Sequence, residues 1–278
     1  MQRVLPVTIF YGKTPLFAKY AIMSARRAFG EEFTVLADAP SPKDGYLCFQ
    51  DYASEDVVRF QDAYQHFSVN GYASELFCFL RWFYLRDCAR AGGHTHILHF
   101  DHDVLVCGTR KDILGSLQEH DLCISHISGH TGWFTLQALE ALCEYLSYFV
   151  RDGFREHLQR HHRRYAAALE ARTPFAVSDM SALEDFFALS PLKKSNAPVG
   201  IMVNVNLPEH GCVINPKTGI LDLYVYNGGV YSKKENGEFL RWFTLHFQGA
   251  AKRHLPALYK LFLHHPEAQT DGYIRYCG

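Results

Sequence analysis

The stretch ILHFDHDVLV, residues 97–106, places two carboxylates, Asp101 and Asp103, directly after a run of apolar residues. The run 97–100 is typical of a buried strand, and the apolar pattern resumes at 104–106. We therefore expect a tight bend in which both carboxylates could bind a divalent cation through hard oxygen ligands. A strand-end turn that is merely capped by acids has the same local pattern, so the spacing alone leaves both interpretations open.

The sequence upstream of this stretch has the alternation of a parallel sheet. Residues 7–12 form a short β-rich run, 15–30 carry apolar residues at helical spacing, and 33–38 form a second apolar run. Strand, helix and strand at this length predict a βαβ unit, whose two strands are parallel. Ligands of such sheets bind at the carboxyl ends of the strands, which makes Tyr11 and Asp38 candidate binding residues.

Downstream, the pattern predicts further helices and strands and then β-hairpins. The expected elements are a long buried helix at 74–93 that Ser74 begins, a strand at 120–128, a helix at 136–149, a basic helical segment at 151–172, hairpins between 212 and 249, and a short amphipathic helix at 252–265. The fold class that follows is α/β, with a mainly parallel sheet flanked by helices and a β-hairpin-rich C-terminal part.

Composition narrows the class of protein. The 278 residues carry a formal net charge of −1, whereas a dedicated nucleic-acid-binding protein has a clear basic excess, so we expect no nucleic-acid partner. No stretch approaches the ~18 apolar residues of a membrane span, and no secretory signal is visible. The eight cysteines contain no CxxC pair. We expect a cytoplasmic protein and leave contact with a membrane surface open.

A second motif, His246-Phe-Gln-Gly249-Ala-Ala-Lys252, lies late in the chain. A neutral imidazole is a suitable further ligand for an Mn²⁺-type ion that carboxylates already hold. Gly249 would let the backbone approach a phosphate closely, and Lys252 would supply a point charge for it. A lone histidine in an apolar strand is more often a core residue, but the combination of all three residue types favours a binding site.

The strand–helix–strand start, the DxD at residues 101–103 and the late HxxGxxK together resemble the GT-A glycosyltransferases, and among them the glycogenin-like retaining enzymes of family 8 type. The resemblance implies a single GT-A-like domain, with a nucleotide-sugar-binding half at 1–110 and an acceptor and catalytic half at 111–278. It also implies ligands for Mn²⁺ (or Mg²⁺), namely Asp101, Asp103 and His246, and contacts to the donor diphosphate from Gly249 and Lys252.

Three shorter matches extend the resemblance. Arg81 corresponds to a family arginine that reaches the nucleotide-sugar site. Residues 129–134, GHTGWF, occupy the place of the family's Asn-Ser/Thr-Gly turn beside the donor sugar, with His130 instead of Asn. Asp179 matches the acid of the family's DQxxLN segment, which sits at the reactive carbon of the sugar, whereas Met180 replaces the following amide. After the motif lysine this chain has Arg-His where the family has Pro-Trp.

The activity implied is transfer of a sugar from a nucleotide-diphosphate sugar, preferably a uridine one, to a saccharide, lipid-linked or protein acceptor. Tyr11 could stack on the base and Asp38 could accept from the base or ribose, although both also fit ordinary strand-end residues. With retention, Asp179 would stabilise an oxocarbenium-like centre. With inversion, Asp179, Glu184 or Asp185 would be the base, and the sequence leaves this choice open.

Two other function classes compete with this one. A DxD after an apolar strand also begins haloacid-dehalogenase phosphatases, but that pattern requires Thr or Val where this chain has Leu105. The second competitor is a non-catalytic sugar- or nucleotide-binding protein on a degenerate transferase fold. The changes at His130 and Met180 favour it, whereas the intact set of three expected metal ligands disfavours it. The basic segment 151–172 is either a solvated helix face or a contact for an anionic partner.

Overall fold

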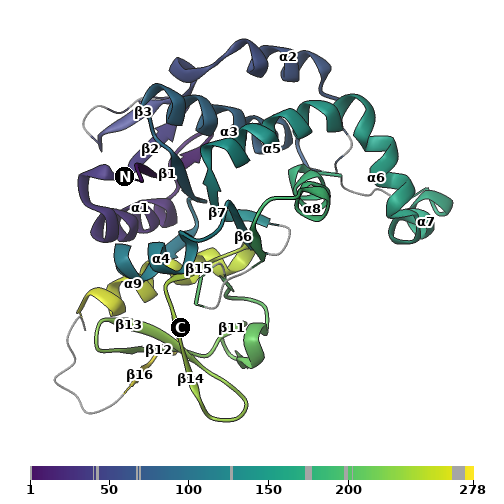
Figure 1. Ribbon diagram of the computed structural model, residues 1–278. Coiled ribbons are helices and arrows are strands. Elements are labelled where there is room, and N and C mark those ends of the chain that lie inside the picture. Colours follow the sequence, from purple (N-terminus) through teal and green to yellow (C-terminus); the bar gives the residue numbers. More distant parts are fainter. Residues whose placement is uncertain are drawn as a thin grey trace.

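A seven-stranded, mainly parallel sheet with the order β3-β2-β1-β4-β7-β6-β8 forms the centre of the computed structural model (Figure 1). The structure describes residues 2–39, 41, 44–66, 68, 70–125, 128–172, 177–196, 200–201, 203–264 and 273–278. Strands β3, β2, β1 and β4 are parallel, β7 is antiparallel to both neighbours, and β8 is parallel to β6. The strands are β1 (Val4–Phe10), β2 (Thr34–Ala37), β3 (Tyr46–Cys48), β4 (His96–Phe100), β6 (Leu122–Ser125), β7 (Ser128–Thr135) and β8 (Lys194–Asn196). The α/β class and the βαβ start are confirmed.

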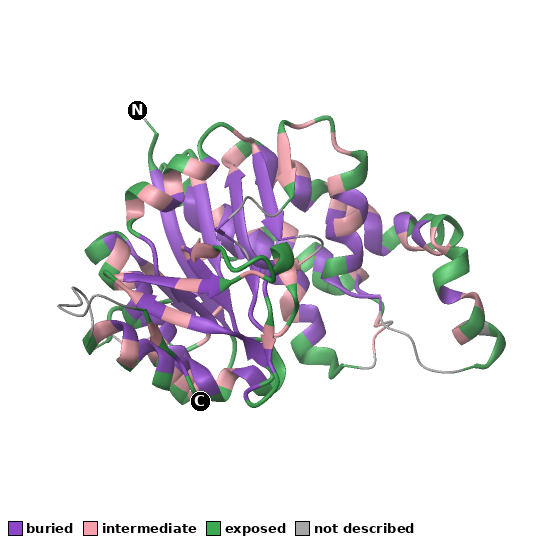
Figure 2. Ribbon diagram, turned by 90° about the horizontal axis from the view of Figure 1, so that it is seen from below, coloured by how far each residue is buried: buried purple, intermediate pink, exposed green. Residues whose placement is uncertain are grey.

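Helices cover both faces of this sheet. One face packs against α1 (Leu16–Phe29) and α4 (Arg110–Leu117), and the other against α3 (Tyr72–Ala91), α5 (Leu136–Tyr148) and α8 (Asp179–Leu189). Helix α2 (Glu55–Ala63) packs on α3. Because successive strand side chains point to opposite faces, Ile97 packs with α3 and α5, whereas Leu98 packs with α1 and α4. The same alternation directs His99 towards α3. Figure 2 shows the central strands of this sheet buried over most of their length.

A second, three-stranded sheet begins directly after the bend that follows β4. In it β5 (Val104–Val106) is antiparallel to β15 (Thr244–His246), and β15 is parallel to β9 (Val203–Asn204). His246 lies opposite Val104 on one side and opposite Asn204 on the other. The expected bend at 101–103 therefore joins two sheets, and the strand expected at 104–106 is confirmed.

The C-terminal part consists of hairpins and a final helix, as the sequence predicts. Asn227 and Gly228, both with positive φ, form the tight turn between β12 and β13. The strands are β10 (Ile214–Asn215), β11 (Ile220–Leu221), β12 (Leu223–Tyr226), β13 (Gly229–Lys233), β14 (Phe239–Trp242) and β16 (Ile274–Arg275). The chain also forms the short helical turns η1 (Gly30–Glu32), η3 (Phe49–Tyr52), η5 (Glu209–Gly211) and η6 (Gly249–His254), and η6 leads into the helix α9 (Leu255–His264).

Residues 129–134 form part of strand β7 and not the turn that the resemblance implies. The strand pairs with β4 on one side and β6 on the other, and it is buried. Gly129 fits here because the ring of Trp82 occupies the place where a Cβ would stand. Pairing with strands distant in sequence therefore overrides the turn-like local composition.

Two expected helices differ in their details. Helix α3 begins at Tyr72 after Gly71, so Ser74 lies inside its first turn and does not cap it. The segment expected at 151–172 begins inside a π-helical turn, η4 (Phe149–Gly153), and continues as α6 (Phe154–Arg160) and α7 (His162–Glu170). Figure 1 shows α6 and α7 extending away from the sheets as an arm.

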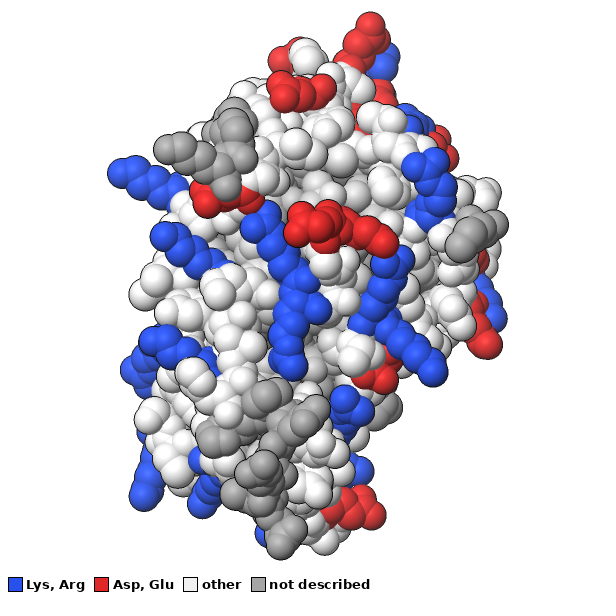
Figure 3. Space-filling view, turned by 90° about the vertical axis from the view of Figure 1, so that its left-hand side faces the viewer, with Lys and Arg blue, Asp and Glu red and all other residues white. Residues whose placement is uncertain are grey.

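The surface carries charges of both signs. In Figure 3, Lys and Arg side chains on the face shown alternate with Asp and Glu side chains, and neither sign covers it continuously. Among the described residues, no helix has the length and apolar character needed to cross a bilayer.

Leu98→Ala should lower the free energy of unfolding by about 2–5 kcal/mol, because the side chain is fully buried between β4 and the helices α1 and α4. Urea denaturation measures the change. Val58→Ala, on the exposed face of α2, is the matched control and should stay within about 0.5 kcal/mol of wild type. Equal effects of the two substitutions would contradict this packing.

Candidate active site

Three side chains that could hold a cation converge where the two sheets meet. Asp101 and Asp103 come from the bend after β4, and His246 ends β15. The ligand atoms of all three lie within 4.8 Å of one another. The pairing of β5 with β15 continues in a hydrogen bond from Phe247 N–H to the Asp103 carbonyl at 3.0 Å. This register brings together the two motifs that lie far apart in the sequence.

Arg81 connects these ligands to Asp179. Its Nη1 donates to Asp101 Oδ1 at 2.7 Å, and its Nη2 donates to Asp179 Oδ2 at 2.7 Å. Arg81 is on α3, and Asp179 is the first residue of α8. Charge-assisted hydrogen bonds of this length belong to the strong class. A single guanidinium therefore fixes the spacing between an expected metal ligand and the expected catalytic acid.

The two carboxylates bound to Arg81 have opposite pKa shifts. Burial would raise the pKa of Asp101, but the charge of Arg81 and the hydrogen bond from His99 Nε2 at 3.0 Å outweigh it and hold the pKa well below its usual range. Burial raises the pKa of Asp179, and the negative charge of Glu75 adds to this effect while Arg81 opposes it. Asp101 is therefore the more firmly ionised partner of Arg81.

Asp103 lies between a histidine and a lysine. Its Oδ2 forms an ion pair with Lys252 Nζ at 3.0 Å, and its Oδ1 is 3.4 Å from His246 Nε2. Burial and the like charge of Asp101 would raise the pKa of Asp103, but the groups around it, the Lys252 ammonium among them, outweigh both and lower the pKa. Asp103 Oδ1 is buried, and no described residue donates a well-aligned hydrogen bond to it. A buried oxygen of this kind needs a ligand or a donor to satisfy it.

The charges and donor atoms of the site fit a divalent cation. Three carboxylates, on Asp101, Asp103 and Asp179, face two cationic side chains, on Arg81 and Lys252, which leaves a net charge of −1. Two carboxylates and one imidazole form a ligand set that suits Mn²⁺ and related ions. The unsatisfied Asp103 Oδ1 belongs to this same set. The residues present therefore fit the metal that the sequence predicts.

The HxxGxxK motif places backbone and a cation beside open space. Gly249 has φ +56°, a left-handed conformation that favours glycine, and a Cβ there would meet no atom within 4 Å. Lys252 has a side chain that is 33% exposed, with Nζ 5.1 Å from the centre of the Phe17 ring. His102 stacks on the same phenyl ring at a centroid distance of 5.5 Å. A partly exposed cation next to accessible backbone is what phosphate binding requires.

The other expected donor-binding residues lie at the same edge of the large sheet. Tyr11 follows β1, Asp38 follows β2 and Asp101 follows β4, and these neighbouring parallel strands end on one side. Tyr11 is 55% exposed and packs against the ring of Phe77, with centroids 5.7 Å apart. Within the described part of the chain, no hydrogen bond links Tyr11 or Asp38 to Asp101. Topology alone brings them together.

Three further polar residues contact the site. The His130 ring stacks on that of His246 with centroids 4.0 Å apart, and burial lowers the pKa of His130 well below its usual value, so its ring is neutral. His99 and Asn204 were missed in the sequence. Alternation along β4 could have placed His99 on the face of Ile97, whereas no local signal marks Asn204, whose contact depends on the pairing of β9 with β15.

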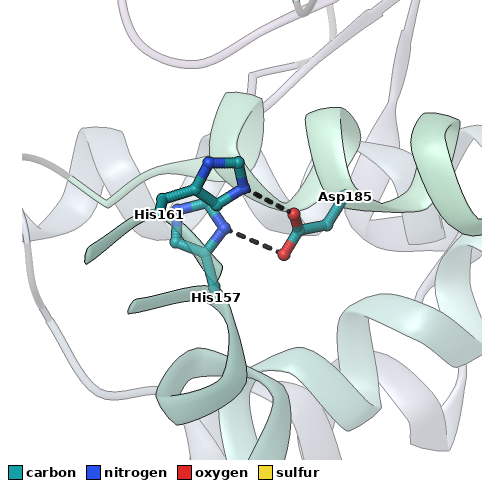
Figure 4. A group of neighbouring side chains, drawn as sticks. All are labelled: His157, His161 and Asp185. Carbon is teal, nitrogen blue, oxygen red and sulfur yellow. Dashed lines mark hydrogen bonds and ion pairs between the residues drawn. The ribbon is translucent and has the colours of Figure 1, made fainter. Parts of the chain in front are cut away.

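Asp185, one of the bases considered for inversion, is bound within a separate group (Figure 4). Its Oδ2 interacts with His157 Nδ1 at 2.8 Å and with Arg160 Nη1 at 3.1 Å, and its Oδ1 interacts with His161 Nε2 at 3.1 Å. The three partners come from α6 and the residue that follows it. These bonds fasten the C-terminal half of α6 to α8, and they occupy both oxygens of Asp185.

Asp179 is therefore the acid of α8 that joins the ligand group. Glu184 pairs with Arg164, with Nη–Oε distances of 2.7 and 2.9 Å. Among the described residues, neither Glu184 nor Asp185 forms a hydrogen bond or ion pair with Arg81. Met180 is 40% exposed and has no polar group that could replace the family's amide.

Comparison with known proteins gives structural likeness only. No protein-family profile and no curated protein sequence matches the chain. A glycosyltransferase involved in the glycosylation of the major capsid of PBCV-1 matches with TM-score 0.46 and 10% identity, over 92% of this chain and 99% of that one. Mouse xyloside xylosyltransferase 1 matches with TM-score 0.48 and 10% identity, over 76% and 90%. The glycosyltransferase GlyE of Streptococcus pneumoniae TIGR4 matches with TM-score 0.37 and 13% identity, over 70% and 45%. All three are glycosyltransferases.

The group around Asp185 predicts a pH-dependent contribution to stability. Burial would raise the pKa of Asp185, but the hydrogen bonds from His157 and His161 outweigh it and lower the pKa. A carboxyl with a lowered pKa stabilises the fold above its unfolded pKa of about 4, and this contribution is lost as the pH falls through the folded value. Asp185→Asn should therefore cost about 3 kcal/mol at neutral pH, and this difference should shrink below about pH 4.

Urea denaturation of wild type and Asp185→Asn across this pH range measures the difference. Asp62→Asn, on an exposed carboxylate of α2, is the control and should show no such trend. A difference between wild type and Asp185→Asn that stays constant with pH would contradict the assignment.

Proposed function

We propose that the chain is a metal-dependent glycosyltransferase that moves a sugar from a nucleotide-diphosphate sugar to an acceptor. The observation that carries this proposal is the convergence of three cation ligands with the lysine and glycine of the HxxGxxK motif. A donor of this class joins its nucleoside to its sugar through two phosphates. A site for it must therefore offer both a cation and positive charge for the diphosphate.

The diphosphate side of the reaction falls to Lys252 and Gly249. Bound Mn²⁺ or Mg²⁺ would supply Lewis-acid chemistry at the diphosphate. Lys252 Nζ, which pairs with Asp103 Oδ2 at 3.0 Å, would exchange that partner for a phosphate oxygen. Gly249 leaves the space beside its backbone open to the phosphates. Both residues act on the negative charge that develops as the bond between sugar and phosphate oxygen breaks.

The sugar side of the reaction falls to Asp179. We assign its carboxylate to the reactive carbon, where, with retention, it stabilises the positive charge of an oxocarbenium-like centre. Arg81 holds Asp179 through one nitrogen and Asp101 through the other. The guanidinium therefore positions the sugar side of the site relative to the diphosphate side.

The base and the acceptor complete the proposal. We assign Tyr11 and Asp38 to the nucleotide base and ribose, with uridine as the preferred base, because they follow β1 and β2, which lie in sequence beside β4 in the sheet. The acceptor is a saccharide, lipid-linked or protein hydroxyl that must reach the reactive carbon beside Asp179.

Mn²⁺ together with a UDP- or GDP-sugar should raise the Tm of the wild-type chain more than either does alone, because ligands that bind the folded state stabilise it. Asp103→Ala should abolish this metal-dependent increase, since it removes a cation ligand. Differential scanning fluorimetry with a panel of donors measures both, and Asp62→Ala is the control. The absence of a shift with every donor would contradict the transferase, and full metal-dependent donor hydrolysis by Asp103→Ala would contradict the metal ligand.

Lys252→Ala should raise the Kd for UDP in the presence of Mn²⁺ by about 10- to 100-fold, because a hydrogen bond to a charged group contributes about 1.5–3 kcal/mol. Isothermal titration calorimetry measures the Kd. Lys260→Ala, which removes an exposed lysine of α9, is the matched control and should bind UDP as wild type does. Unchanged UDP affinity in Lys252→Ala would remove this residue from the diphosphate site.

A further inference from the structure

His246 presents its two ring nitrogens to two different partners. Nε2 lies 3.4 Å from Asp103 Oδ1, on the side of the cation ligands, and Nδ1 lies 2.6 Å from Asn204 Oδ1. An imidazole nitrogen binds a cation only when it carries no proton, and a neutral ring then carries its proton on the other nitrogen. The value of His246 as a ligand therefore depends on what holds the proton at Nδ1.

Glu209 determines which way the Asn204 amide faces. Glu209 Oε1 lies 3.1 Å from Asn204 Nδ2 and also accepts the backbone N–H of Asn204 at 3.3 Å. An ionised carboxylate only accepts hydrogen bonds, so the amide atom beside it is the NH₂ group. The carbonyl oxygen of Asn204 must then face His246, where it accepts a proton from Nδ1.

We propose that Glu209 and Asn204 form a positioning pair that sets His246 in its Nδ1–H tautomer and leaves Nε2 free for a cation. Asn204 contacts His246, and Glu209 contacts Asn204. The pair acts through the histidine: the carboxylate orients the amide, and the amide holds the proton. Ligating histidines commonly donate their second ring N–H to an oxygen in this way, which raises the basicity of the ligating nitrogen.

Two further contacts keep the ring where this pair needs it. The backbone of β9 is paired with that of β15 so that Asn204 and His246 lie directly opposite each other. The ring of His130 stacks on that of His246 with an interplanar angle of 14°. The ring plane and the strand register are thus fixed by packing, and the hydrogen bonds decide only which nitrogen carries the proton.

The alternative arrangement has a definite chemistry. If the Asn204 amide were reversed, its NH₂ group would donate to Nδ1, and Nε2–H would point at Asp103 Oδ1. The amide oxygen would then face the Glu209 carboxylate at about hydrogen-bond distance, where two acceptors repel. In this arrangement His246 could not bind a cation without losing a proton.

The tautomer can be read in the metal-free chain. ¹⁵N-histidine labelling and two-dimensional ¹H–¹⁵N NMR distinguish a protonated, pyrrole-type nitrogen from an unprotonated, pyridine-type one, and His246→Gln identifies the His246 signals. We expect a pyrrole-type Nδ1 and a pyridine-type Nε2 in wild type. In Asn204→Leu, which removes the acceptor at similar size, the ring should shift to the Nε2–H form. A pyrrole-type Nε2 in wild type, or an unchanged ring in Asn204→Leu, would overturn the proposal.

A double substitution separates the hydrogen bonds from the folding of β9. In Asn204→Asp/Glu209→Gln, a carboxylate at position 204 accepts the proton from Nδ1, and an amide at position 209 donates to that carboxylate. This variant should keep the Nδ1–H tautomer, whereas Asn204→Leu loses it. Asn196→Leu, at an exposed position of β8, is the matched control and should leave the His246 signals unchanged. Loss of the tautomer in the double variant would argue that Asn204 acts only as a structural residue.

The consequence for metal binding rests on the proposed function and is measured apart from it. Mn²⁺ affinity, followed by the electron paramagnetic resonance signal of the free ion, should fall about tenfold or more in Asn204→Leu and recover in the double variant. If wild type binds no Mn²⁺ but shows the Nδ1–H tautomer, the metal-dependent function fails and the positioning pair stands. If wild type binds Mn²⁺ and Asn204→Leu binds it equally well, the positioning role fails and the function stands.

Discussion

The pairing of three short strands, β5, β15 and β9, is the constraint on which the candidate site depends. Their register places His246 between Val104 and Asn204, next to the bend that carries Asp103. A slip of one residue would put an apolar neighbour of His246 in its place. Buried side chains on all three strands, Leu105, Leu245 and Val203, belong to one apolar cluster and hold that register. Apolar packing thus positions polar ligands that have little tendency to approach one another.

Bringing these carboxylates together requires positive charge even without a metal. Asp101 raises the pKa of Asp103 through like charge, while Lys252 acts in the opposite direction. The charge of Arg81 likewise lowers the pKa of Asp101. Because both aspartates stay ionised in the folded chain, their oxygens are ready to bind a cation without first losing protons. Binding of a cation by Asp103 would still require Lys252 to move. Its partly exposed side chain can leave Asp103 for another anion.

Sequence patterns predicted the helices and strands whose own residues carry a clear period or turn signal. They also predicted the motifs whose residues lie close together in sequence. The βαβ start, the strands at 97–100 and 104–106, helix α5 and the C-terminal hairpins follow from period and turn residues. The pattern did not predict strand β7, because its glycines have low strand propensity. The strand forms because it pairs with β4 on one side and β6 on the other. The pattern also did not identify Asn204, because a single asparagine acquires its role only from the strand beside it.

Helix α8 shows how the arm and the site are joined mechanically. Its first residue, Asp179, is bound by Arg81. Asp185 lies six residues later, about 9 Å along the helix axis. It is bound by His157, Arg160 and His161, in the C-terminal half of α6 and just after it. Both ends of this short segment are thus held by charged hydrogen bonds to different parts of the molecule. A carboxylate assigned to a reacting carbon must be held to within a fraction of an ångström. The group around Asp185 ties the position of α8, and with it that of Asp179, to the position of α6.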